Sequence, residues 1–444
     1  MNFKVKKGKG VRGEITIPGD KSISHRSIMC SSLAEGKSKI YGFLEGEDCL
    51  ATKLAFQDMG INFETNNDEI VVHGSGLYGL KEPKKEINLG NSGTSIRLLS
   101  GILSAQKFSS TLIGDESLSS RPMNRIIEPL SLMGANIKSQ NSGRPPLEIG
   151  KSDMLNSINY DLPIASAQVK SCILFASLYS KGKTIVREKQ TTRNHTEIMF
   201  KQFGVPLSIR DTDGGRDIEM YSPANLKSTE IDIPGDFSSA AFFILAALII
   251  PNSNLIIKNV GMNETRTALL NAFQEMGAEI DIINKFGEFE PRADLRVKFS
   301  KLKGINLDTK LVPNLIDELP AFFVAAAMSS GSTTVRDAEE LRHKESDRLE
   351  AMGDVLRSLG IDFNMYQDGM DINGLDDNNA LSSYTGRKIE SFGDHRIAMS
   401  SAIACSLYDQ ESLVLNTDNV NTSFPTFLKI AEQVGLDISL EEHS

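Results

Sequence analysis

Basic residues recur in this sequence at one kind of place, the first turn of an apolar helix or the loop beside it. Such a helix start offers free backbone N–H groups and the positive end of the helix dipole, and both attract anions. A single Arg there is usually a solvated charge, but repeated placement predicts a site for phosphate and carboxylate groups. The residues of this class are Lys21, Arg26, Arg97, Arg121, Lys170, Arg193, Lys344, Arg348 and Arg396.

Two acidic residues occur at positions where the other segments carry cations. Asp317 lies in LIDELP and Glu345 lies in HKESDR. A carboxylate among cations stays ionised and can accept a proton from a hydroxyl, and a Lys among other cations has a lowered pKa and can donate one. Asp317 and Glu345 are therefore candidates for proton transfer, and the alternative is that both are helix caps or ion-pair partners.

The candidates recur because the chain repeats one unit of structure. Each unit reads as a short strand, a turn, a helix of small apolar residues, another strand and an amphipathic helix that ends in a hydrophobic residue and Gly. The apolar helix should be buried, and the amphipathic helix should lie against a sheet. The closing glycines are 70 to 83 residues apart and suit helix C-caps with positive φ; they are Gly60, Gly134, Gly204, Gly277, Gly360 and Gly435.

The repeats predict an α/β protein with two similar domains, each of three βαβαββ units whose buried helices face a central cleft. A chain of 444 residues also exceeds what one hydrophobic core usually organises. The string IPGD, at 17–20 and again at 233–236, marks where the chain would cross between domains. We expect residues 1–20 to form an N-terminal strand that joins the second domain, residues 21–235 the first domain and residues 236–444 the second.

Composition excludes several classes of protein. The net charge of −10 argues against a nucleic-acid-binding surface, and no apolar run approaches the ~20 residues that a membrane span needs. The N-terminal MNFKVKKGKG lacks a following apolar segment, so we expect a cytoplasmic protein. The four cysteines are far apart and form no zinc or disulfide pattern, and HGSGLYG is followed by a Pro where a dinucleotide-binding helix should run.

Eight strings together resemble one family. PGDKSISHR, LGNSGTSIRLL, RPM, ASAQVKS, TRNHTE, LIDELP, KESDRL and GDHRIAM occur in this order. With them the whole chain resembles the EPSP synthase (3-phosphoshikimate 1-carboxyvinyltransferase) family. RPMNR, ASAQVK and a TSFP string in place of K-T-F-P resemble the bacterial subgroup called class II.

The resemblance implies the two-domain enolpyruvyl transferase fold and a specific reaction. The family transfers the enolpyruvyl (1-carboxyvinyl) group of phosphoenolpyruvate to the 5-hydroxyl of shikimate 3-phosphate and releases phosphate, by addition and elimination. This is a step toward chorismate and the aromatic amino acids, and it needs no metal or organic cofactor. Glyphosate mimics phosphoenolpyruvate, and the absence of a side chain at Gly93 implies sensitivity to it.

The resemblance also implies roles for individual residues. The positions that match the shikimate 3-phosphate site are Lys21, Ser22, Arg26, Ser166, Ala167, Gln168 and Arg193, of which Lys21 and Gln168 also reach phosphoenolpyruvate. The positions that match the phosphoenolpyruvate site are Gly93, Arg121, Arg348 and Arg396. Asp317 matches the acceptor of the hydroxyl proton, with Lys344 beside it, and either Lys21 or Glu345 would protonate C3 of phosphoenolpyruvate.

Two alternatives stay open at this level. UDP-N-acetylglucosamine enolpyruvyl transferases share the architecture, but they use a loop Cys near an R-P dipeptide, and the loop GDESLSSRPM has none. A non-catalytic binder of phosphorylated ligands could retain the cations, although it would not need both Asp317 and Glu345. We expect the partners to be the two small-molecule substrates, with no nucleic acid and no membrane, and the protein to be a monomer.

Overall fold

The chain divides into two units at the IPGD strings. The computed structural model describes residues 1–66, 68–140, 142–222, 224–375 and 387–441. A continuous unit comprises Gly19–Ile233, and a discontinuous unit comprises Met1–Pro18 and Pro234–Ser444. Each unit has its own hydrophobic core. In the part of the chain that the structure describes, every helix is too short or too polar to cross a membrane.

The continuous unit contains three sheets, which correspond to three repeats. The first has the order β15(Leu226–Lys227), β3(Ala34–Tyr41), β5(Glu69–Ser75), β4(Asn62–Asn66), with β16(Glu230–Asp232) parallel to β3. The second has the order β6(Ile87–Asn88), β7(Ser110–Ile113), β9(Arg144–Ile149), β8(Ile137–Gln140). The third has the order β10(Leu155–Asn156), β12(Ser180–Glu188), β14(Gly215–Ser222), β13(Leu207–Thr212), with β11(Asn159–Asp161) parallel to β12.

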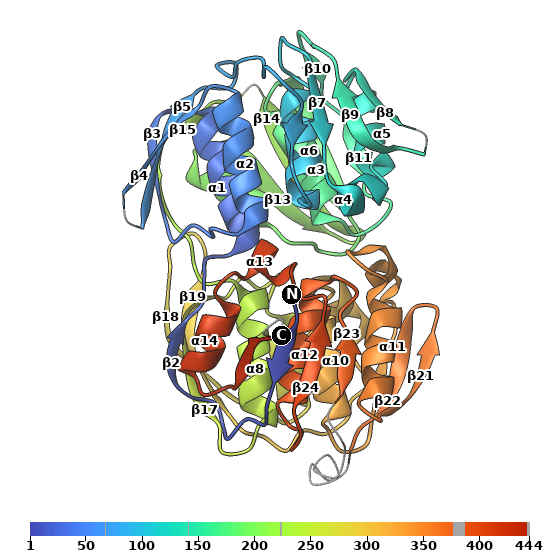
Figure 1. Cartoon of the computed structure of the whole chain (residues 1–444). Helices are drawn as coiled ribbons and strands as arrows, with labels where there is room; N and C mark the ends of the chain where they lie inside the picture. The colour runs from blue at the N-terminus through green and yellow to red at the C-terminus, as the bar shows by residue number, and fades with distance from the viewer. Residues whose placement is uncertain (67, 141, 223, 376–386, 442–444) are drawn as a thin grey trace. The chain divides into compact units, whose positions relative to one another are not determined.

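One largely buried helix belongs to each of these repeats. The three are α1(Lys21–Leu33), α3(Gly93–Leu103) and α6(Ala167–Ser177), and α3 packs against both α1 and α6 (Figure 1). The remaining helices of the unit are α2(Glu47–Asp58), α4(Glu116–Ser120), α5(Asn124–Leu132) and α7(His195–Gln202).

The described residues of the discontinuous unit also form three sheets. The first has the order β18(Glu279–Phe286), β19(Arg292–Lys298), β17(Asn254–Gly261), β2(Arg12–Thr16). The second has the order β20(Ser332–Val335), β22(Gly369–Asn373), β21(Asp362–Tyr366). The third has the order β23(Lys388–Glu390), β24(Ser412–Leu415), β1(Phe3–Val5), β25(Ile438–Leu440).

Three buried helices pack on one another at the centre of this unit. They are α8(Phe237–Ile249), α10(Leu319–Ala327) and α12(His395–Cys405), and Figure 1 shows them side by side. All residues of α8 and α10 are buried, as their almost wholly apolar sequences predict. The other helices are α9(Ala268–Glu275), α11(Arg348–Ser358), α13(Val420–Ser423) and α14(Phe427–Gln433), with 3₁₀ turns η1(Thr309–Asn314) and η2(Glu339–His343).

The predicted α/β class and its repeat are confirmed. The six glycines after the amphipathic helices all have positive φ, between 76° and 91°. In that backbone conformation an L side chain is strained, which explains why Gly recurs at the helix ends.

The IPGD strings lie where two strands exchange sheets. β2 precedes α1 in the chain but pairs in parallel with β17 of the discontinuous unit. β16 precedes α8 but pairs in parallel with β3 of the continuous unit. The strand before each IPGD string therefore belongs to one unit, and the helix after the string belongs to the other unit.

The starts of the buried helices are fixed by side-chain caps. The side chains of Asp20, Ser92, Ser166, Asp236 and Asp394 accept hydrogen bonds from backbone N–H groups of the first turn. These caps set the position of the polar residues that follow them in the chain, which include Lys21, Ser22, Gln168 and Arg396 of the predicted site.

Candidate functional site

Lys21 and Ser22 form the first turn of α1, and both are partly exposed. The Lys21 ammonium forms an ion pair with Asp48 of α2. The backbone oxygen of Ser22 accepts a hydrogen bond from Nη1 of Arg26 at 3.0 Å. The start of α1 is thus held by α2 on one side and by the next turn of its own helix on the other.

Arg26 is a buried cation, with 4% of its surface exposed. Its Nε donates to Oγ1 of Thr196 at 2.7 Å, and its Nη2 donates to Oγ of Ser171 at 2.8 Å. Burial lowers the pKa of Arg26 to about 10, although nearby Glu197 and Asp20 act in the opposite direction. The guanidinium is therefore still charged at neutral pH, and its position is fixed by two helices.

Gly93 is the first residue of α3 and lies against two guanidinium groups. A Cβ added there would be 2.9 Å from Nη1 of Arg97 and 3.1 Å from Nη1 of Arg121. Arg121 donates from Nη2 to Oδ1 of Asn91 at 2.6 Å and to Oγ of Ser117 at 3.1 Å. The lack of a side chain at Gly93 allows both cations to approach the start of the helix.

Gln168 links the starts of α3 and α6. Its Oε1 accepts a hydrogen bond from Nη1 of Arg97 at 2.6 Å, and its Nε2 donates to Oγ1 of Thr94 at 3.0 Å. Ser166 caps α6 by accepting from the N–H of Val169, and Ala167 follows it as the first residue of the helix. Ser166, Ala167 and Gln168 are all partly exposed.

Arg193 and Lys170 differ although both were expected to line an anion site. Arg193 is partly exposed in the loop before α7. The Lys170 ammonium is wholly buried and lies 2.9 Å from Glu188 and 2.7 Å from Glu197. The prediction that Lys170 forms part of an open anion seat is wrong, because two carboxylates already neutralise it.

In the discontinuous unit, Asp317 lies beside two cations. Its Oδ1 is 3.6 Å from Nζ of Lys344 and 3.5 Å from Nη1 of Arg348. Its backbone oxygen accepts a hydrogen bond from Nη1 of Arg396 at 2.9 Å. The structure therefore brings together the predicted proton acceptor and the three basic residues assigned to the same site.

Arg348 is the buried centre of this group. Its Nε donates to Oδ2 of Asp394 at 2.7 Å, and its Nη2 lies 3.7 Å from Oε2 of Glu345. Burial by itself lowers the pKa of Arg348, but Asp394, Glu345 and Asp317 outweigh burial, so the pKa rises above its ordinary value. Arg348 is a permanent cation, and it links both candidate proton-transfer acids of the unit.

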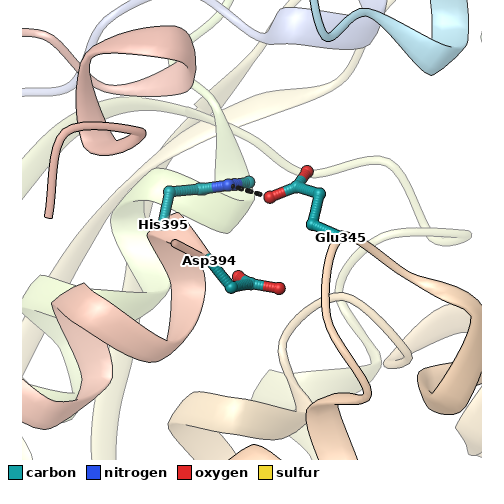
Figure 2. A group of neighbouring side chains, drawn as sticks. All are labelled: Glu345, Asp394 and His395. Atoms are coloured by element: carbon teal, nitrogen blue, oxygen red, sulfur yellow. Dashed lines mark hydrogen bonds and ion pairs between the residues drawn. The ribbon is translucent and has the colours of Figure 1, made fainter. Parts of the chain in front are cut away.

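Glu345 contacts a histidine that follows the cap of α12. Its Oε2 lies 2.6 Å from Nδ1 of His395, and Figure 2 shows Glu345 and His395 pointing toward one another with Asp394 beside them. Donor atoms of these three residues lie within 4.8 Å of one another, as metal ligands would. A metal ion would compete with the Arg348 guanidinium for the same carboxylates, so this arrangement better suits the orientation of Glu345 than metal binding.

The sequence missed several partners of the predicted residues. Asp48 pairs with Lys21, Asn91 with Arg121, Thr196 with Arg26 and Asp394 with Arg348. Asp394 and His395 could have been found, because both belong to the string GDHRIAM and Asp394 stands at a helix cap. Thr196 could have been found in the same way, because it belongs to the string TRNHTE, whereas Asp48 gave no such signal, since it lies in none of these strings.

The predicted residues thus form one set in each unit. The set of the continuous unit is Lys21, Ser22, Arg26, Gly93, Arg121, Ser166, Ala167, Gln168 and Arg193, and that of the discontinuous unit is Asp317, Lys344, Glu345, Arg348 and Arg396. Each set combines fixed cations with helix starts, and only the second also offers carboxyl groups among the predicted residues. The first set suits the binding of anions, and the second suits anion binding together with proton transfer.

Solved structures resemble this chain closely. An EPSP synthase from Acinetobacter baumannii is 46% identical, with a TM-score of 0.88 over 99% of this chain and 100% of that chain. The enolpyruvyl transferase NikO from Streptomyces tendae has a TM-score of 0.80 over 100% of this chain and 99% of that chain, at 13% identity. The second likeness shows the shared fold alone.

Related proteins match the sequence of this chain over almost its full length. The 3-phosphoshikimate 1-carboxyvinyltransferase of Legionella pneumophila (strain Lens) is 48% identical over 447 residues, which cover 100% of both chains. That of Methylococcus capsulatus is also 48% identical and covers 98% of this chain and 97% of its own. The family model described as EPSP synthase (3-phosphoshikimate 1-carboxyvinyltransferase) matches residues 5–430. The chain therefore belongs to the EPSP synthase family.

Proposed function

We propose that this protein is an enzyme that transfers the enolpyruvyl group of phosphoenolpyruvate to the 5-hydroxyl of shikimate 3-phosphate and releases phosphate. This reaction is a step toward chorismate and the aromatic amino acids. The observation that carries the proposal is the Asp317 carboxylate, held 3.5 Å from Arg348 and 3.6 Å from Lys344, in a chain that belongs to the EPSP synthase family.

The residues of the continuous unit bind shikimate 3-phosphate in this proposal. Lys21, Arg26 and Arg193 supply positive charge, and Ser22, Ser166, Ala167 and Gln168 supply hydroxyl, amide and backbone groups at helix starts. Lys21 and Gln168 also contact phosphoenolpyruvate. Support comes from the fixed position of Arg26, whose guanidinium meets two hydroxyl groups and a backbone oxygen.

Phosphoenolpyruvate is bound by guanidinium groups at Arg121, Arg348 and Arg396, with Gly93 leaving room for it. Such groups match phosphate and carboxylate in geometry as well as charge. Because Arg121 and Arg348 are already held by their own partners, they need little reorganisation when the substrate binds.

Proton transfer follows an addition and elimination sequence. Asp317 accepts the proton of the 5-hydroxyl of shikimate 3-phosphate. The oxygen of that hydroxyl attacks C2 of phosphoenolpyruvate, and C3 receives a proton from Lys21 or Glu345. The tetrahedral intermediate then loses a proton from C3 and expels phosphate, which restores the vinyl group. Lys344, close to Asp317, stabilises its carboxylate between steps.

The substrates are small anions, and the protein acts as a cytoplasmic monomer in this proposal. The net charge of −10 supports the absence of other anionic partners, since it opposes association with nucleic acid or with an anionic membrane surface.

The test measures phosphate release from phosphoenolpyruvate with shikimate 3-phosphate or UDP-N-acetylglucosamine as the acceptor. We expect release only with shikimate 3-phosphate, and loss of most release in Asp317→Ala. Release with the UDP-sugar would identify the rival transferase. Tight binding of shikimate 3-phosphate without any release would instead identify a non-catalytic binder.

A further inference from the structure

A cluster of four buried charges lies behind the proposed shikimate 3-phosphate residues. It consists of Arg26, Lys170, Glu188 and Glu197, whose exposed surface is 4% or less in every case. Removal of an ion from water costs several kcal/mol, and ion pairs inside proteins seldom return more than apolar packing would. Oε1 of Glu188 and Oε2 of Glu197 also lack hydrogen-bond partners among the described residues. Stability alone therefore does not account for the cluster.

Lys170 joins three elements at one point. It lies on α6, one turn beyond Ser166, and its ammonium contacts Glu188 at the end of β12 and Glu197 in the first turn of α7. It also donates to the backbone oxygen of Thr192 at 3.4 Å. The ammonium thus holds both ends of the loop 189–194 that connects β12 to α7.

Glu188 holds the same loop from its other side. Its Oε2 accepts from the N–H of Thr192 at 3.2 Å and from Oγ1 of Thr192 at 2.7 Å. Thr192 is 5% exposed and His195 is 2% exposed, whereas Arg193 between them is partly exposed. The backbone on both sides of Arg193 is fixed by buried contacts, so the direction in which Arg193 leaves the loop is set by the cluster.

The cluster reaches Arg26 through hydroxyl groups. Oγ1 of Thr196 and Oγ of Ser171 are 2.7 Å apart, and both accept hydrogen bonds from the Arg26 guanidinium. Thr196 and Ser171 adjoin Glu197 and Lys170 in the chain. The same buried group therefore places the two arginines that are assigned to shikimate 3-phosphate.

We propose that Lys170, with Glu188, is a positioning residue that fixes Arg193, and with it the phosphate-binding geometry for shikimate 3-phosphate, without contacting the substrate. This inference rests on the proposed function. It predicts that loss of the cluster weakens shikimate 3-phosphate binding through Arg193, while the protein keeps its fold and its proton-transfer groups.

The test compares Lys170→Met/Glu188→Gln with the unchanged protein. The double substitution removes one positive and one negative charge and leaves Glu197 opposite Arg26, so the buried charge stays balanced. We expect the Kd for shikimate 3-phosphate, measured by calorimetry, to rise about tenfold. We expect Lys170→Arg, which keeps the positive charge, to bind shikimate 3-phosphate more tightly than the double variant and less tightly than the unchanged protein. Lys183→Met removes a half-exposed Lys of the same strand β12 and should leave the Kd unchanged.

A double-mutant cycle separates positioning from general loosening of the unit. In an Arg193→Ala background, the double substitution should change the Kd by less than about twofold, because the group that it positions is already absent. A full additional loss in that background would overturn the inference. The inference would also be overturned if Lys170→Met/Glu188→Gln, with Arg193 present, had the same Kd for shikimate 3-phosphate as the unchanged protein.

Two further measurements keep the result interpretable. Circular dichroism and the melting temperature report whether the double variant folds; if it does not, Glu188→Ala, which leaves Lys170 paired with Glu197, is expected to give the same rise in Kd. If the unchanged protein neither binds shikimate 3-phosphate nor releases phosphate, the proposed function fails. If it does both and the variants bind equally well, only the role of Lys170 fails.

Discussion

Asp317 is placed to act as a base, since its carboxylate lies 3.6 Å from Nζ of Lys344 and 3.5 Å from Nη1 of Arg348. We expect Asp317→Asn to lower turnover by about 10²- to 10⁴-fold, the usual contribution of a general base, with little change in melting temperature. Steady-state phosphate release measures turnover, and calorimetry measures the melting temperature. Asp354→Asn, at an exposed Asp of α11, serves as the control. Near-normal turnover of Asp317→Asn would remove the assigned base.

His25 is a buried group whose protonation should affect stability. Burial keeps its pKa well below the ordinary value of 6.5, and nearby Lys21 and Arg26 act in the same direction. Below pH 6.5 the unfolded chain therefore binds a proton that the folded chain excludes, so folding stability declines as pH falls and is fully present above that pH. Below pH 6.5, we expect His25 to lower the free energy of unfolding by up to about 1.4 kcal/mol per pH unit.

The contribution of His25 is measured by comparison with His25→Gln. Gln does not titrate and can still reach Oγ1 of Thr52, the present partner of Nδ1 at 2.7 Å. Urea unfolding should show that the free energy of unfolding falls more between pH 7 and pH 5 for the unchanged protein than for His25→Gln. Equal losses would mean that His25 is not the group that titrates.

At the scale of elements, the start of α3 depends on the absence of a side chain at Gly93. A Cβ would displace only the ends of Arg97 and Arg121, so Gly93→Ala should fold but bind phosphoenolpyruvate and glyphosate less well. We expect the glyphosate inhibition constant to rise about tenfold, or about 1.4 kcal/mol. Gly214→Ala, where a Cβ would meet nothing within 4 Å, is the matched control. An unchanged inhibition constant would contradict the assigned role of Gly93.

Elements were the part of this molecule that its sequence specified best. Each closing Gly marked a helix end because only a residue without Cβ accepts φ near 90° at low cost, and all six occur there. Apolar strings such as SAAFFILAAL predicted buried helices, and α8 is buried along its whole length.

Side-chain partners were much harder to predict. The position of Lys170 at a helix start suggested an anion seat, but the carboxylates that neutralise it come from β12 and α7, whose packing a local pattern does not encode. The same limit applies to Arg26 and Thr196, which are 170 residues apart in the chain. Motif strings predicted the site residues, whereas the contacts that fix these residues follow from tertiary structure.

At the scale of the whole molecule, β1 completes the core of the discontinuous unit, most of whose residues lie in Pro234–Ser444. β1 lies between β24 and β25, and Phe3 is fully buried, with its ring stacked on that of Phe427 at 5.9 Å. We expect Phe3→Ala to destabilise the discontinuous unit by about 3–5 kcal/mol, the usual cost of truncating a buried Phe.

Chemical denaturation followed by circular dichroism measures this loss. Lys4→Ala, on the half-exposed face of the same strand, should change stability by no more than about 0.5 kcal/mol. If Phe3→Ala were as stable as the unchanged protein, β1 would not be needed for the core that it appears in.

The exchange of strands at the IPGD strings has a consequence for synthesis on the ribosome. β1 and β2 are made before Gly19–Ile233, but their pairing partners β17, β24 and β25 are made after it. Meanwhile Gly19–Ile233 is complete and can fold as it leaves the exit tunnel. The nascent chain must therefore carry two unpaired strands while the whole continuous unit is made, and the basic residues of MNFKVKKGKG, which includes β1, provide charges that discourage these strands from aggregating.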